Sequence, residues 1–166
     1  FDTGHGVRGL WADGEDRVYV DASLSRALVI LARGSGTWST VEARIDLAEG
    51  LNEPRDPVEL QGEILFHRSA DRRMSQEAYL GCGSCHLEGA NDGQTWDFTE
   101  RIEGLRNTTS LRGGGALDGP LHWTGNFDEF QDFEHDIRGY QLGSGFMDPD
   151  DFDPWDPLGE PKVGLS

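Results

Sequence analysis

The sequence predicts an α+β fold, in which one four-stranded β-propeller-like blade precedes a mainly α-helical, loop-rich domain. Three observations predict it. Short runs of strand-forming residues alternate with turns through residues 1–52. Pro54 and Pro57 then mark a linker, and a length of 166 residues allows one large or two small domains. Glycine accounts for 23 residues, roughly twice its average share, which indicates many turns. We therefore divide the chain into residues 1–52 and 53–166.

Four runs in residues 1–52 are expected to form antiparallel strands. They are Val7–Ala12, Arg17–Asp21, Ala27–Ala32 and Val41–Asp46. Asp13-Gly14 is typical of a hairpin turn between the first two runs. Four strands in about forty residues match one propeller blade, and a lone blade leaves its edges unprotected. We therefore expect further blades before Phe1, which indicates a processed product or a piece of a longer protein. A small independent β-meander is the alternative.

Residues 53–166 show a different pattern. Val58–Arg73 carries apolar residues at helical spacing, and Phe127–Arg138 predicts a short amphipathic helix with acidic faces. Between them, Gly81–Gly119 has little periodicity and is expected to be a long loop. Long loops in compact domains usually have a function or enclose something.

The charge is strongly negative, and this excludes some partners. Lys and Arg number 14 against 31 Asp and Glu, so the formal net charge is −17. Such a chain repels nucleic-acid phosphates and anionic lipid surfaces, so no nucleic-acid partner is expected. No apolar run is long enough to span a bilayer.

The only two cysteines lie in one short motif. Cys82, Cys85 and His86 form the C-x-x-C-H string that attaches c-type haem. Covalent attachment needs two thiols one helical turn apart, and the following histidine then reaches the iron as its proximal ligand. The motif thus predicts one covalent haem c per chain and a cytochrome c-like haem domain. Because such attachment takes place outside the cytoplasm, we expect a periplasmic or extracellular bacterial protein.

Three other interpretations of the two cysteines stay open. A structural zinc site usually needs four Cys or His ligands, and only three lie close together here. A thioredoxin-like redox pair is expected to follow a strand and open a helix in a βαβ unit, which does not surround this motif. A disulfide between Cys82 and Cys85 would close a very small loop.

The sixth ligand of the iron decides between electron transfer and catalysis. The candidates are His122, His135 and Met147, with Met74 and His67 as further ones. Met147 ends a Gly-rich stretch that we expect to be flexible enough to fold over the iron, although it could equally be a hydrophobic plug. His122 is expected to support the site rather than to bind iron. His135 has acidic neighbours in sequence and is expected to be solvated.

Several short motifs follow one another in an order known from one family. Before the haem motif lie Val18-Tyr19-Val20, Leu24-Ser25-Arg26, Gly62–Phe66 and Met74-Ser75, and after it lie Asn91–Trp96, Gly104–Leu111 and Leu121–Gly125. In this order the chain resembles the bacterial di-haem cytochrome c peroxidase and MauG-like proteins, particularly relatives in which a YVTN-type β-propeller precedes the haem domains. The chain looks like a fragment with the last blade and the first haem domain.

The resemblance implies roles for individual residues. Asn107 matches an asparagine that contributes to a calcium site between two haem domains, and Trp123 matches a tryptophan that relays electrons between the haems. The partners implied are the remaining propeller blades and a second haem domain, in the same polypeptide or another subunit. The chain departs from the family because it has one haem motif and no recognisable peroxide-handling Gln, Pro and Glu.

Two functions follow from these observations. The first is a c-type haem redox protein, part of a di-haem peroxidase-like oxidoreductase that moves electrons between haems. The second is a non-enzymatic monohaem electron-transfer cytochrome, or a subunit of a multihaem assembly. In that case the acidic tail Phe127–Pro157 would dock a small basic redox protein.

Overall fold

The computed structural model describes residues 3–34, 36, 38–50, 52–113 and 120–155. The chain divides into two compact units, Phe1–Arg68 and Ser69–Ser166, and each is described by itself. Within the described residues, no helix is both long and apolar enough to cross a membrane.

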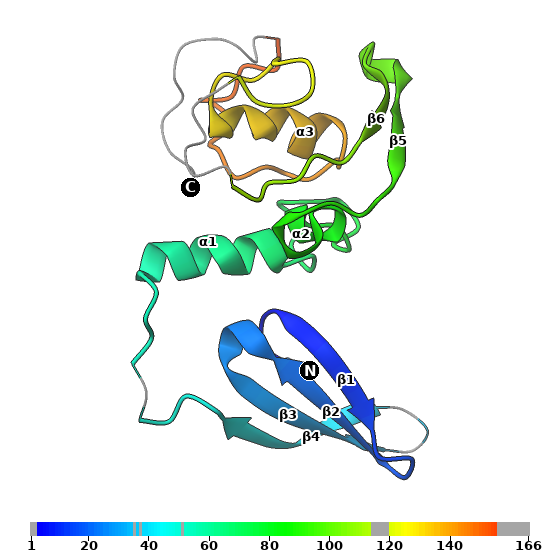
Figure 1. Ribbon diagram of the computed structural model, residues 1–166, viewed down its shortest axis with the longest axis vertical. Helices are drawn as coiled ribbons and strands as arrows, with labels where there is room; N and C mark the ends of the chain where they lie inside the picture. Colours follow the sequence, from blue (N-terminus) through cyan, green and yellow to red (C-terminus); the bar gives the residue numbers. More distant parts are fainter. Residues whose placement is uncertain (1–2, 35, 37, 51, 114–119, 156–166) are drawn as a thin grey trace. The chain divides into compact units, whose positions relative to one another are not determined.

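The first unit is built on one antiparallel sheet. Its strands are β1 (Val7–Ala12), β2 (Arg17–Ala22), β3 (Ala27–Arg33) and β4 (Trp38–Asp46), paired in the order β1-β2-β3-β4 (Figure 1). The four expected strands are confirmed, with β4 beginning at Trp38 rather than at Val41. This strand order is that of a β-meander.

Local chemistry explains the turns and the core of this sheet. The carboxylate of Asp13 accepts hydrogen bonds from the N–H groups of Glu15 and Arg17, at 2.9 and 3.3 Å, and so closes the turn between β1 and β2. Alternating residues of β2 and β3 point to one face, where Val20, Val29 and Leu31 form a buried apolar cluster.

Helix α1 (Pro57–His67) follows the sheet in the same unit. Asp56 caps its N-terminus by accepting the N–H of Val58 at 2.8 Å, and Pro57 occupies the first turn, where its missing N–H costs nothing. The backbone turns extended at Arg68. The helix therefore ends well before Arg73, the end that hydrophobic spacing predicts.

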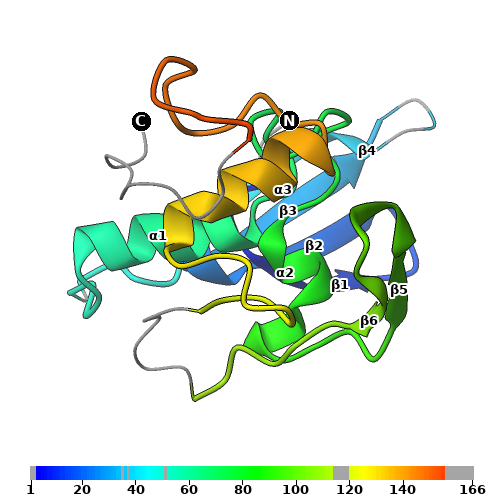
Figure 2. The same ribbon diagram turned by 90° about the horizontal axis from the view of Figure 1, so that it is seen from above.

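The second unit consists of short elements. They are α2 (Cys82–Cys85), η2 (Leu87–Gly89), β5 (Thr95–Phe98), η3 (Thr99–Arg101), β6 (Gly104–Asn107), η4 (Phe130–Phe133) and α3 (Glu134–Gly139). Strands β5 and β6 form an antiparallel hairpin, seen side by side in Figure 2. This hairpin lies within the expected long loop, Gly81–Gly119.

Two distant segments close the second unit. Residues 72–76 run beside residues 141–145, with hydrogen bonds from Gln76 N–H to the Gln141 carbonyl at 3.1 Å and from Ser144 N–H to the Arg72 carbonyl at 3.1 Å. The buried side chains of this unit are Met74, Ser75, Phe127, Asp132, Glu134, Phe146 and Met147. The core of the unit is thus partly polar.

The predicted fold class is wrong. The described residues contain one four-stranded antiparallel sheet and no closed propeller, and residues 53–166 are not mainly α-helical. Only 11, 4 and 6 residues lie in α1, α2 and α3, and β5 and β6 form a second, two-stranded sheet. Four short strands with tight turns suit any small meander, so their number and spacing did not specify a blade. In the expected helix Phe127–Arg138, α-helical geometry starts only at Glu134.

Candidate haem-attachment site

The C-x-x-C-H motif forms a single helical turn. Gly81 is extended and precedes α2, and its N–H donates to the Ser84 hydroxyl at 3.1 Å. At the other end, the N–H of His86 donates to the Cys82 carbonyl at 3.0 Å. Cys82 and Cys85 therefore lie one turn apart, and both are half-buried free thiols.

Burial controls the chemistry of the two thiols. It raises the pKa of the Cys82 thiol, and it raises the pKa of the Cys85 thiol together with the nearby charge of Asp92. Zinc binding and disulfide exchange both use the thiolate, which this environment disfavours. Among the described residues, no three His, Cys, Asp or Glu side chains gather around a point that could hold a metal ion. A haem iron needs only one or two axial side chains.

One hydrogen bond fixes the orientation of the His86 ring. Nδ1 of His86 lies 2.9 Å from the carbonyl oxygen of Thr109, which comes just after β6. A carbonyl oxygen only accepts, so Nδ1 carries the hydrogen and Nε2 has the lone pair that a metal takes. Metal-binding histidines in proteins are typically held in this way.

The segment Asn107–Thr109 also holds two tryptophans. The indole N–H of Trp123 donates to the Asn107 carbonyl at 2.5 Å, and the indole N–H of Trp96 donates to the Thr108 hydroxyl at 3.1 Å. Three consecutive residues therefore bind Trp123, Trp96 and His86. The structure brings the expected relay residue Trp123 to within two residues of the carbonyl that holds His86. The side chain of Asn107, the expected calcium ligand, is exposed.

His122 is committed to a network of its own. Its Nδ1 lies 3.1 Å from Asn126 Oδ1, and its Nε2 lies 3.2 Å from Asp136 Oδ2. The ring also packs on Phe127 and Phe133, with centroid distances of 4.2 and 4.9 Å. Because both nitrogens are engaged, His122 would lose one of these contacts on binding iron. Its arrangement is that of a supporting residue.

Met147 is buried in an anchored loop. Its N–H donates to Glu134 Oε1 at 3.1 Å, and its carbonyl accepts from Arg138 at 2.7 Å. Earlier in the loop, the N–H of Gly145 donates to the Arg73 carbonyl at 3.0 Å. The Gly-rich sequence predicts a flexible loop, whereas these hydrogen bonds hold it at Gly145 and Met147. The side chain of Met147 is only 3% exposed.

The other sixth-ligand candidates are scattered. Met74 is buried in the second unit, whereas His67 ends α1 in the first. His135 is half-buried, with ring centroids 6.3 Å from Phe127 and 4.8 Å from Phe152, so it is less solvated than its acidic sequence neighbours suggest. No described contact joins any candidate to His86.

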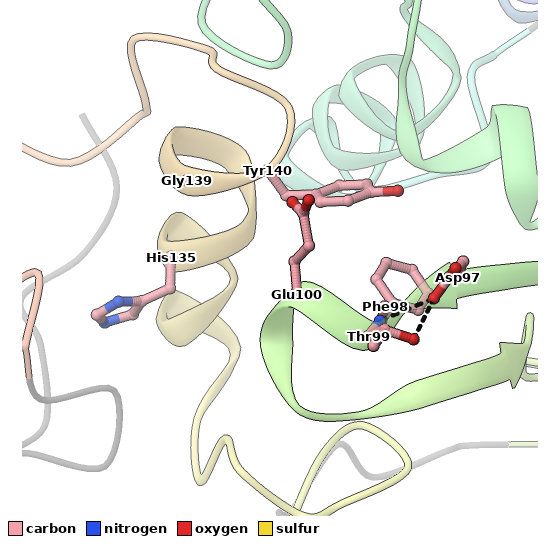
Figure 3. A pocket seen from close by; sticks show the side chains of 7 residues that line it. All are labelled: Asp97, Phe98, Thr99, Glu100, His135, Gly139 and Tyr140. Carbon is pink, nitrogen blue, oxygen red and sulfur yellow. Dashed lines mark hydrogen bonds between the residues drawn. The ribbon is translucent and has the colours of Figure 1, made fainter.

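A separate hollow lies between α3 and the β5–β6 hairpin. It has a volume of about 510 Å³ and is lined by Asp97, Phe98, Thr99, Glu100, His135, Gly139 and Tyr140 (Figure 3). Figure 3 shows the imidazole of His135 pointing away from Glu100 and Tyr140. Among the residues expected to bind the haem or to act near it, only His135 lines this hollow. The hollow is therefore separate from the C-x-x-C-H site.

The chain was compared with known proteins. No protein-family model, curated protein or solved structure matches it. The resemblance to di-haem peroxidases therefore stays a prediction.

The sequence did not reveal the partners of the motif. Thr109 supplies a backbone carbonyl, which any residue type would supply, so no sequence signal marks it. Asp92 and Trp96 belong to a recognisable motif, but their hydrogen bond at 3.0 Å depends on the turn between η2 and β5. Strong turn formers at Asn91-Asp92-Gly93 were the one available signal.

Proposed function

We propose that the chain is a c-type haem redox protein, forming part of a peroxidase-like oxidoreductase that exchanges electrons with a second haem domain. Cys82 and Cys85 hold the haem through thioether bonds, and His86 is its proximal iron ligand. The observation that carries the proposal is the hydrogen bond from Nδ1 of His86 to the Thr109 carbonyl, which leaves Nε2 to the iron. The proposed attachment places the protein outside the cytoplasm, in the periplasm or beyond it.

The half-buried surroundings of the motif support this assignment over the alternatives. Attachment joins each thiol sulfur to a haem vinyl group, and the two thiols lie one helical turn apart as the reaction needs. The pKa of each thiol is raised by burial, which favours the neutral thiol over a zinc thiolate or a redox-active thiolate.

The hydrogen bonds of His122 favour a peroxidase-like role over an electron carrier in which this histidine is the sixth ligand. His122 uses both ring nitrogens in these contacts. When bound, the haem would supply one-electron exchange and reaction with peroxide. The residues of this chain would anchor it through Cys82 and Cys85 and hold His86 in the tautomer that can bind iron.

The test is to produce the chain in a bacterial periplasm with haem-attachment machinery, and to record its absorption spectrum and intact mass. We expect a Soret band, the added mass of one haem, and a high-spin ferric iron that responds to peroxide. The C82S/C85S variant should lack the covalent haem. His86→Gln should change the spectrum, whereas the control His5→Gln, at a histidine with no expected role, should not.

Each alternative has its own signature in this experiment. A protein without the added mass would refute the haem assignment. A low-spin iron that ignores peroxide, and that becomes high-spin in Met147→Leu or His122→Gln, would instead establish the electron carrier.

A further inference from the structure

The two tryptophans on the Asn107–Thr109 segment differ in what their indole N–H groups meet. Trp96 donates to Asp92 Oδ2 at 3.0 Å and to the Thr108 hydroxyl at 3.1 Å. Trp123 donates to the backbone carbonyl of Asn107, which is neutral. Of the two anchored indoles, Trp96 is therefore the one with a carboxylate at its N–H.

Asp92 carries its negative charge at neutral pH. Burial raises the pKa of this carboxyl, but the N–H of Gln94, the Thr108 hydroxyl and the Trp96 indole donate to it and bring its pKa below the ordinary value. Asp92 is thus a fixed negative charge, held by three donors that come from the turn before β5, from β5 itself and from the residue after β6.

A fixed carboxylate changes the redox chemistry of an indole. Loss of one electron leaves the indole positively charged and makes its N–H more acidic. A carboxylate at hydrogen-bond distance stabilises that positive charge and shares the proton, and a charge-assisted hydrogen bond is roughly twice as strong as a neutral one. The carbonyl facing Trp123 gives no such stabilisation, so Trp96 is the easier of the two to oxidise.

Two hydrogen bonds link Trp96 to the proposed haem site. Thr108, whose hydroxyl accepts from the indole, is followed by Thr109, whose carbonyl holds His86 at 2.9 Å. The polar end of Trp96 is therefore joined to the proximal ligand through two adjacent residues of the chain. Trp96 is 37% exposed, so a partner can approach it.

We propose that Trp96 is the residue through which electrons enter the haem site from a one-electron donor protein, and that Asp92 is the positioning residue that makes Trp96 oxidisable. This inference rests on the proposed haem function. Two donors each give one electron, in two successive transfers through the indole. Hydrogen peroxide takes up both electrons with two protons from solvent, its O–O bond breaks, and two waters form. The indole proton stays in the hydrogen bond to Asp92.

The first test locates the oxidised residue. Haem-loaded protein is mixed with one equivalent of peroxide, frozen within milliseconds and examined by electron paramagnetic resonance. We expect a tryptophan radical signal in the wild type and in the control Trp11→Phe, and loss of that signal in Trp96→Phe; Trp123→Phe tests the competing assignment. Asp92→Asn keeps the indole and removes the charge, so we expect about a tenfold lower radical yield.

Two further measurements separate a redox role from a structural one. Ultraviolet resonance Raman spectra report the hydrogen bond of the indole N–H without any peroxide, and the Asp92→Asn spectrum should show a weaker bond. With reduced mitochondrial cytochrome c as the donor, Trp96→Phe should slow donor oxidation at least tenfold, while the Soret band and haem mass stay unchanged.

The failures are distinguishable. If the wild type lacks covalent haem or does not respond to peroxide, the proposed function fails and the relay fails with it. If the wild type responds to peroxide and Trp96→Phe keeps both the radical and the donor rate, only the relay is overturned. Loss of the signal in Trp123→Phe alone would assign the relay to Trp123 instead.

Discussion

Replacing Glu134 by glutamine should loosen the loop that carries Met147. The side chain of Glu134 is 1% exposed. One carboxylate oxygen accepts the N–H groups of Phe146 and Met147, at 2.5 and 3.1 Å, and the other accepts Arg138 Nε at 2.8 Å. In Glu134→Gln the amide NH2 must face one of these donors, and Arg138 loses its buried counter-charge.

The expected magnitude follows from burial. Removing one partner of a buried ion pair typically costs about 3–5 kcal/mol, because the remaining charge stays desolvated. We expect the free energy of unfolding of the second unit to fall by about this amount. The matched control is Glu42→Gln, which breaks the pair with Arg17 on the sheet at 2.7 Å. Both of these side chains are well exposed, so water and salt screen the pair and little stability should be lost.

Amide hydrogen exchange measures both variants, because it reports each unit separately. The amides of Phe146 and Met147 should lose protection in Glu134→Gln, whereas the amide of Val20 in the sheet should not. Protection of Phe146 and Met147 within a factor of about five of the wild type, which is about 1 kcal/mol, would refute the reasoning.

Three further outcomes are expected. The guanidinium of Arg55 lowers the pKa of Glu53 to about 2, although burial opposes this shift. Nuclear magnetic resonance titration should find this pKa. The stability that Glu53 contributes should be complete above its ordinary pKa and should be lost as the pH falls towards 2. Gly145→Ala should destabilise the protein far more than Gly93→Ala in thermal unfolding. Both glycines have positive φ, but a Cβ at Gly145 would overlap the buried carboxylate of Glu134, while nothing lies within 4 Å at Gly93. A hydrogen bond with the Asp132 carboxylate raises the pKa of Asp128. This contact therefore stabilises the folded protein at low pH and weakens as the pH rises. Asp128→Asn should raise the melting temperature at pH about 7 but not at pH about 3.

Local patterns predicted the elements whose signals are short-range. The strands β1 to β3 were predicted to within a residue of their ends, because their apolar residues alternate and turn formers bound them. The β5–β6 hairpin was missed. Its strands have four residues each, and the chain reverses through a 3-10 turn with Ile102 in a left-handed conformation, which no Asn-Gly or Asp-Gly pair signals.

The candidate site was predictable only where its chemistry is local. Cys82, Cys85 and His86 are neighbours in sequence, so their spacing alone indicated the site. The bond from His86 to Thr109 and the commitment of His122 to Asp136 depend on long-range packing. The acidic residues of this region were expected to face solvent, but Asp132 and Glu134 are buried in a partly polar core. Their burial likewise depends on long-range packing.

The pairing of residues 72–76 with residues 141–145 has a consequence for biosynthesis. A ribosome makes the segment around Arg72 long before Ser144, yet each supplies half of the same hydrogen bonds. The last of these hydrogen bonds therefore cannot form until residue 145 has been made. Because distant contacts form last and slowest, we expect closure of the second unit to be a late step of its folding.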